Sequence, residues 1–575
     1  MNHTGRPFSV AKALRVLFDE PLTKGSQSIA QRRAFHDYFV THLPSTSLSP
    51  DRERPTQHHH YPRDESKPHS GSNARAAGLM PTPTNRDTTV VRIPIKSAKH
   101  HFGAGVSRGS RPYNEDTYQA GTIEIPAFAQ RQPISLTRKR GSGGKPVFEN
   151  QAAKSESGDP QVFYFGVFDG HGGSECSEFL RDRLHGYLEE SAVLFGMESS
   201  LRPRNSDLED EAGDYSSEGG IMGAQDAEDL QKSLVSDWKE TVGGYFKRFR
   251  PEWFPAVAPP NSTSGSSNDS QSTNHSSIET VLSFGFLKAD LDFTKAQAAK
   301  RSEPPPSGPP PSSVDDPVLN DKPLNENDVL SNPDRPASQN LSSRPVARGS
   351  SPDLDKPIGS GKRFKGGSTA SIAMFSTPTS TPFWTPASPS TLIVAHVGDT
   401  RVLLCRTDDG KSVPLTTNHH PSTPVEATRL RRYAATFVTD SFGEERILGL
   451  ANTRSFGDIA SKRIGVSAEP QITTTQISPG EHSFLVLMSD GVCGHLSDQE
   501  IVDVVKEAKT PAQAAQDLVA FATEVNPDDA DNATALVVRL GGWERRGEGG
   551  GGSMGTKEQR QYRRDEAADP RARRR

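Results

Sequence analysis

The apolar residues of this chain follow two kinds of pattern. Short runs of β-branched and aromatic residues predict strands at 162–168, 391–397, 401–405, 484–488 and 534–540. Apolar residues at helical spacing predict helices at 174–195, 278–293 and 512–525, and Ser497 with Glu500 forms a capping box before another at 501–505. Because strands and helices come in blocks rather than in strict alternation, the pattern predicts an α+β fold with antiparallel sheets.

Polar, Gly-rich and Pro-rich stretches interrupt this pattern. Of the 575 residues only 32% are hydrophobic, and there are 49 glycines and 45 prolines, so the chain is not packed from end to end. We expect one domain at 98–541, preceded by a disordered linker at 49–97 and followed by a disordered Gly-rich, basic tail at 542–575. Disordered insertions in the domain are expected at about 198–229, 255–277 and 299–360. The acidic and Pro-rich insertions could bind partner proteins.

The first 48 residues differ from the rest in charge. They contain six Lys and Arg residues against three acids, and Val10, Leu14 and Leu17 can share one face of a helix. This composition is typical of a mitochondrial presequence, so we predict a presequence at 1–48 and a mitochondrial location. The alternative is an ordinary disordered terminus with one short helix, in a cytoplasmic protein.

Several classes of protein are excluded by simple counts. No apolar run approaches the 18 or more residues of a membrane-spanning helix. The three cysteines, Cys176, Cys405 and Cys493, are too few and too scattered for a disulfide framework or a Cys-rich zinc site, so we interpret them as free thiols in a reducing compartment. The net charge of -5 gives no indication of nucleic-acid binding.

Carboxylates stand at the ends of several predicted strands. Asp169 follows the strand at 162–168, Asp490 follows the strand at 484–488, and Asp531 precedes the strand at 534–540. A further acidic pair, Glu115 and Asp116, lies after an expected strand at 102–107. An Asp-Gly pair alone is a routine turn signal. Together, carboxylates from separate strand ends can converge on one cleft and bind hard cations such as Mg²⁺ or Mn²⁺.

Eight motifs in a fixed order strengthen this interpretation. They are Arg111–Asp116, Val167–Gly173, Gly367–Ala370, His396–Arg401, Leu450–Asp458, Glu469–Pro470, Ser489–Gly491 and Asp531–Asn532. In this order they resemble the metal-dependent type 2C Ser/Thr protein phosphatases, the PPM family. Thr417–Pro421 and Arg429–Tyr433 are most similar to a divergent fungal mitochondrial branch of that family.

The resemblance implies a fold and a metal site. The fold would be an α-β-β-α sandwich, in which two antiparallel sheets are flanked by helices and a dinuclear site lies at one edge. Matched position by position, Asp169 would bridge two Mg²⁺ or Mn²⁺ ions and Gly170 would give its carbonyl to one of them. Asp490 and Asp531 would hold the other ion.

The resemblance also implies an activity and roles for four more residues. Glu115 and Asp116 would hold a metal or metal-bound waters, Arg111 would grip the substrate phosphate, and His171 would be the general acid. The expected reaction is hydrolysis of phosphoserine and phosphothreonine in protein substrates, by in-line attack of a metal-bridging hydroxide and without a phosphoenzyme. No residue names the phosphoprotein.

Some motif residues are expected to be structural. Asp399, in the motif His396–Arg401, is expected to belong to a hairpin turn, Asp458 to be a buried structural acid, and His419 to lie at the surface.

One departure from the family concerns a third metal. Many members carry an additional acidic pair that supports a weaker third ion, and this chain matches those positions with Asn418 and Gly494. We therefore expect no third ion at these two residues. Asp498 is the nearest acid that could compensate.

Two rival functions are weighed against the phosphatase. Gly105–Gly109 fits the G-x-S-x-G pattern of serine hydrolases, but a nucleophile elbow needs a helix directly after it, and Arg-Pro-Tyr-Asn does not begin one. A pseudophosphatase, which is a binding module on the same fold, usually lacks a metal-binding acid, whereas Asp169, Asp490 and Asp531 are all present here.

Overall fold

The computed structural model describes the chain in blocks. These are residues 38–44, 88–94, 101–131, 159–201, 224–257, 277–300, 363–379, 381–431, 438–439, 445–446, 450–525, 530–547 and 562. The predicted insertion at 299–360 lies almost wholly outside these residues, as do most of the predicted presequence, linker and tail.

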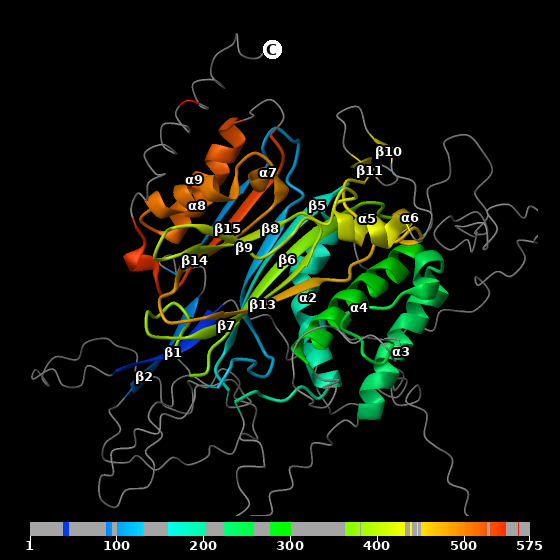
Figure 1. Cartoon of the computed structure of the whole chain (residues 1–575), viewed down its shortest axis with the longest axis horizontal. Coiled ribbons are helices and arrows are strands. Elements are labelled where there is room, and N and C mark those ends of the chain that lie inside the picture. The colour runs from blue at the N-terminus through cyan, green and yellow to red at the C-terminus, as the bar shows by residue number, and fades with distance from the viewer. Residues whose placement is uncertain are drawn as a thin grey trace, which may run out of the picture.

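Two antiparallel sheets form the centre of the molecule (Figure 1). The first has the order β13 (Gln471–Ile477), β7 (Ser390–Val397), β6 (Gly367–Ser376), β5 (Val162–His171) and β4 (Thr117–Ile123), and β12 (Phe456–Gly457) pairs with β6. The second has the order β3 (Phe102–Ser107), β15 (Ala533–Arg539), β14 (His482–Met488), β8 (Arg401–Arg406) and β9 (Ser412–Pro414). This confirms the antiparallel α+β prediction.

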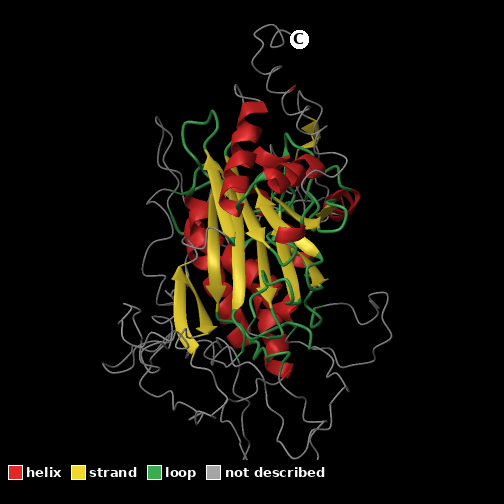
Figure 2. Ribbon diagram, turned by 90° about the vertical axis from the view of Figure 1, so that its left-hand side faces the viewer, coloured by secondary structure: helices red, strands yellow, loops and turns green. Residues whose placement is uncertain are grey.

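Helices cover the outer face of each sheet (Figures 1 and 2). Against the first sheet lie α2 (Glu175–Leu194), α3 (Ala224–Thr241), the 3-10 helix η4 (Gly244–Arg248) and α4 (Ile278–Ala298). Against the second lie α7 (Asp490–Cys493), α8 (Asp498–Glu507) and α9 (Pro511–Val525). Two short helices, α5 (Pro424–Arg431) and α6 (Ile459–Lys462), lie in the connection between β9 and β13. None of the helices in these described blocks is long and apolar enough to cross a membrane.

β5 shows why the central strands are nearly continuous apolar runs. Its side chains alternate between the two faces of the sheet. Phe163, Phe165 and Val167 pack in the core between the sheets, whereas Tyr164 and Phe168 pack in the core beneath the helices. Both faces are therefore buried, and the usual alternation of apolar and polar residues disappears.

The structured region extends beyond the predicted boundaries. α3 begins at Ala224, inside the insertion predicted at 198–229, because Leu230, Leu234 and Trp238 form an apolar stripe that is buried against the first core. At the other end, Trp543 of η8 (Trp543–Arg545) is only 2% exposed although we predicted that the tail begins at 542.

A two-stranded sheet lies in the region predicted to be presequence and linker. β1 (Tyr38–Pro44) pairs with β2 (Thr88–Pro94), and the short strands β10 (Val438–Thr439) and β11 (Glu445–Arg446) form a second small pair. The linker predicted at 49–97 therefore contains a strand.

Candidate functional site

Three carboxylates meet where the two sheets lie together. Asp169 is on β5, Asp490 begins α7 directly after β14, and Asp399 lies in the turn between β7 and β8. One oxygen of each lies within 4.8 Å of the others. The expected turn residue Asp399 is thus in a turn, but its carboxylate also belongs to this cluster, a role that the sequence analysis missed.

The three carboxylates of this cluster are only partly exposed, and their charges repel one another. Burial raises the pKa of Asp490 to about 8, and the charges of Asp399 and Asp531 add to the effect. The pKa of Asp169 is raised well above its ordinary value, first by burial and then by Asp490 and Asp116. A cation beside these carboxylates would offset the repulsion and favour their ionised forms.

Asp116 is a fourth acid beside this cluster, and it is buried. Its Oδ2 accepts a hydrogen bond of 2.7 Å from the hydroxyl of Ser489, the residue before Asp490. Burial raises the pKa of Asp116 to about 6, and its Oδ1 has no hydrogen-bond partner among the described residues. An orphaned buried oxygen beside an acidic cluster fits a divalent cation, which prefers carboxylate ligands.

Glu115 and Gly170 bring the acidic loop against β5. The carboxylate of Glu115 accepts a hydrogen bond of 2.7 Å from the backbone N–H of Gly173. A Cβ atom at Gly170 would lie 2.4 Å from the backbone carbonyl oxygen of Glu115, so only glycine allows this approach. Glu115 therefore holds the loop to the turn after β5 and is not one of the three clustered acids.

Arg111 and Asp531 form an ion pair at the solvent side of the site. A guanidinium nitrogen of Arg111 lies 2.8 Å from Oδ2 of Asp531, and both side chains are half exposed. The charge of Asp531 contributes to the raised pKa values of Asp116 and Asp490. Arg111 is thereby held beside the acids.

His171 is bound to Asp458. Its Nε2 lies 2.8 Å from Oδ1 and 3.0 Å from Oδ2 of this almost fully buried carboxylate. Burial of the ring lowers the pKa of His171, but hydrogen bonding to Asp458 and its charge outweigh this, so the net pKa is raised. Asp458 is buried, as expected, and it also orients a proposed catalytic side chain.

Asn418 and Asp498, which the sequence analysis considered for a third ion, lie outside the cluster of three acids. Asn418 is exposed, and its carbonyl accepts a hydrogen bond from the Thr423 hydroxyl. Asp498 cannot compensate, because both of its oxygens accept hydrogen bonds of 2.6 Å from Arg401. Asp399 does belong to the cluster, and the side-chain amide of Asn452 donates a hydrogen bond to it at 2.9 Å.

The serine-hydrolase pattern has no catalytic geometry. Ser107 is the last residue of β3, and its hydroxyl accepts a hydrogen bond from the N–H of Gly109. A turn rather than a helix follows, so the nucleophile elbow is absent from this described segment.

Comparisons with known proteins agree with this geometry. The family model described as protein phosphatase 2C matches residues 324–531. Protein phosphatase 2C homolog 4 of Schizosaccharomyces pombe is 31% identical over 459 residues, which are 79% of this chain and 84% of the relative. The mitochondrial protein phosphatase 1K of Xenopus laevis is 39% identical over 153 residues, which are 26% of this chain and 40% of that protein.

Among solved structures, the serine-threonine phosphatase 2C of Toxoplasma gondii aligns with a TM-score of 0.39 at 15% identity, over 76% of this chain and 94% of that one. The family assignment rests on the yeast relative, which is similar along most of its length. Together with the cluster of three acids, that similarity identifies the chain as a member of the protein phosphatase 2C family, which makes it a metal-dependent protein serine/threonine phosphatase.

Proposed function

We propose that this phosphatase hydrolyses phosphoserine and phosphothreonine by direct in-line attack of water, without a phosphoenzyme. The observation that carries the proposal is the cluster of Asp169, Asp399 and Asp490, whose mutually repelling carboxylates could hold cations. Asp169, Asp490, Asp531 and the carbonyl of Gly170 would hold two Mg²⁺ or Mn²⁺ ions. Such ions, when bound, neutralise the repulsion between the phosphate and its attacking water and lower the pKa of that water.

Around these ions, the side chains of the loop before β4 would orient the phosphate. Arg111 is proposed to bind phosphate oxygens through its planar guanidinium, and its pairing with Asp531 keeps it at the site. The unpartnered Oδ1 of Asp116 is proposed to accept a hydrogen bond from water or to coordinate a cation. Glu115 is proposed to act through its contact with Gly173, which fixes the turn that carries His171.

His171 is proposed to donate a proton to the leaving oxygen of the substrate serine or threonine. Its Nε2 is held by Asp458, so Nδ1 is the nitrogen proposed to transfer the proton. The raised pKa favours the protonated ring near neutral pH, which is the form a general acid needs.

The cysteines support a reaction without a covalent cysteine intermediate. Burial raises the pKa of Cys176, Cys405 and Cys493 above that of an ordinary thiol. A protonated thiol is a poor nucleophile, because the thiolate is the reactive form. Attack by water therefore accounts best for the chemistry.

The location of the protein is a separate proposal. The basic residues before Tyr38 support a mitochondrial presequence. Because β1 pairs with β2, processing at residue 48 would remove β1, so we propose that a presequence ends before Tyr38. Mass measurement of the mature N-terminus of a C-terminally tagged protein tests both statements, and an unprocessed cytoplasmic protein would reject them.

The activity is tested by phosphate release from a phosphothreonine peptide in the presence of Mn²⁺. We expect turnover that is abolished by a chelator and restored by Mn²⁺ or Mg²⁺, with little release from a matched phosphotyrosine peptide. A well-folded protein that binds the metal but releases no phosphate would favour the pseudophosphatase instead.

A further inference from the structure

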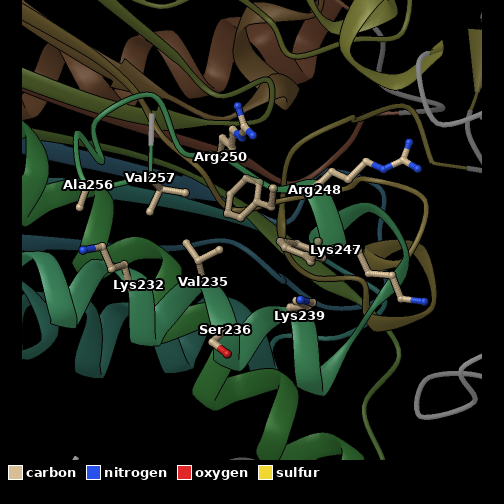
Figure 3. A pocket seen from close by; sticks show the side chains of 11 residues that line it. Lys232, Val235, Ser236, Lys239, Lys247, Arg248, Arg250, Ala256 and Val257 are labelled. Atoms are coloured by element: carbon tan, nitrogen blue, oxygen red, sulfur yellow. The ribbon is translucent and has the colours of Figure 1, made fainter. Parts of the chain in front are cut away.

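A pocket lies outside the acidic site, between α3 and the segment that follows it (Figure 3). Its volume is about 760 Å³. One wall is α3, with Lys232, Val235, Ser236 and Lys239, and the facing wall is formed by residues 246–250 and 256–257. The proposed catalytic residues do not line it.

The charge of the lining is strongly one-sided. The basic residues are Lys232, Lys239, Lys247, Arg248 and Arg250, and none of the described lining residues is acidic. All five side chains are exposed. Within the described part of the chain, Lys232 pairs with Glu228, whereas Lys239, Arg248 and Arg250 have no carboxylate partner.

The floor of the pocket is apolar and well packed. Phe246 and Phe249 are buried, and Phe246 stacks on Trp238 of α3 with ring centroids 4.3 Å apart. Val235 and Val257 remain partly exposed beside them. This aromatic packing fixes the floor, so a ligand would meet a preformed surface with little ordering cost.

The chain segment opposite α3, residues 245–257, is hydrogen-bonded to the region of the active site. The backbone N–H of Tyr245 donates to the carbonyl of Arg463, and that of Glu252 donates to the buried carboxylate of Glu469. Arg463 directly follows α6, the helix that begins after Asp458. The pocket is therefore attached to the loop that orients His171.

We propose that this pocket binds an acidic segment of the protein substrate. An apolar side chain of that segment would lie on the floor, and its carboxylates would pair with the basic lining residues. Lys232 and Lys239 are seven residues apart on α3, which is about 10 Å along the helix axis. That spacing matches about three residues of an extended peptide and is too long for one phosphate group. The inference rests on the proposed function, because it assigns the segment to the substrate.

The first test measures binding without catalysis. A fluorescent peptide that contains Asp and Glu around one Leu, but no phosphate, is titrated into the full chain. We expect binding that weakens with salt, and a loss of at least about 10-fold in affinity for the double variant Lys239→Glu, Arg250→Glu. Lys411→Glu, an exposed residue of the β8–β9 turn, is the matched control and should bind the peptide normally.

A second test measures use of the pocket in turnover. For a phosphopeptide that carries the acidic segment, the double variant should raise KM, whereas hydrolysis of a small aryl phosphate should be unchanged. If the wild type hydrolyses neither substrate but binds the peptide, and the double variant loses that binding, the proposed function is rejected and the pocket is supported.

Three results would overturn the proposal. The first is equal peptide affinity in the wild type, the double variant and Lys411→Glu. The second is binding of single-stranded RNA or inorganic phosphate in place of the peptide. The third is peptide binding only after the acids between 207 and 218 are neutralised, which would assign the pocket to the chain's own acidic segment.

Discussion

The imidazole of His171 and the carboxylate of Asp458 are 2.8 Å apart, although 287 positions separate them in the chain. Asp458 adopts a left-handed backbone conformation, with φ of 46°, and it is the single non-glycine residue in the described blocks with positive φ. A Cβ atom at Gly367 would lie 2.4 Å from Oδ2 of Asp458, so the glycine leaves room for this carboxylate. Strain of this kind is retained where the surroundings enforce it, commonly at functional sites.

The first prediction concerns this pair. His171→Gln should lower kcat by about 10²-fold or more for an alkyl phosphopeptide, and much less for an aryl phosphate, because a general acid matters most for a basic leaving oxygen. Asp458→Asn should show the same dependence on the leaving group. Steady-state kinetics on both substrates provides the measurement.

A double variant separates positioning from a general structural role. If Asp458 acts through His171, Asp458→Asn should cost little more in kcat once His171 is already Gln. Fully additive losses, or equal losses on both substrates, would show that Asp458 does not act through His171.

The second prediction concerns metal binding. Asp490→Asn and Asp169→Asn should each weaken Mn²⁺ binding and lower kcat by at least about 100-fold while the protein remains folded, because a metal ligand is lost and no core packing changes. Calorimetric titration with Mn²⁺ measures the affinity. Asp408→Asn, at an exposed turn, is the control, and normal turnover by a folded Asp490→Asn protein would remove the metal assignment.

The third prediction separates Asp399 from Asn418. Asp399→Asn should weaken metal binding, since its carboxylate belongs to the clustered acids. Asn418→Asp should leave the Mn²⁺ titration unchanged, because that side chain is exposed in the loop before α5. Calorimetry on both variants measures the difference. An extra metal equivalent created by Asn418→Asp alone would reverse this assignment.

The sequence was sufficient to predict the strands that carry the acids, since each acid adjoins a strongly apolar run of residues. The sequence was insufficient to predict contacts between residues that lie far apart in the chain. Asp399 is indistinguishable from a turn residue until the turn is placed beside Asp169 and Asp490. Likewise, we expected His419 at the surface, but it is buried, where it stacks on His396 and accepts a hydrogen bond from the N–H of Gly398. Packing of this kind leaves no periodic pattern of apolar residues in the sequence from which it could be predicted.

The fourth prediction concerns a buried ion cluster behind the site. Both oxygens of Glu426 accept hydrogen bonds from arginines, Oε1 from Arg454 and Oε2 from Arg429, each at 2.7 Å. Burial raises the pKa of Glu426, but the charges of Arg429 and Arg454 outweigh it and hold the pKa well below its ordinary value of 4.5. Glu426→Gln should therefore lower the free energy of unfolding at pH 7 by about 3 kcal/mol, since it removes the carboxylate that both guanidinium groups share.

The effect of Glu426→Gln on the free energy of unfolding should depend on pH. A carboxyl whose pKa is lower in the folded state stabilises the protein fully above its unfolded pKa, and this contribution is lost as the pH falls through the folded value. The difference between wild type and Glu426→Gln should thus be constant near neutral pH and shrink below about pH 4.5 as the unfolded carboxyl becomes protonated. Urea unfolding from pH 7 down to pH 3 measures it, with the exposed Glu198→Gln as control. A difference that grows on acidification would mean that Glu426 is not ionised in the folded protein.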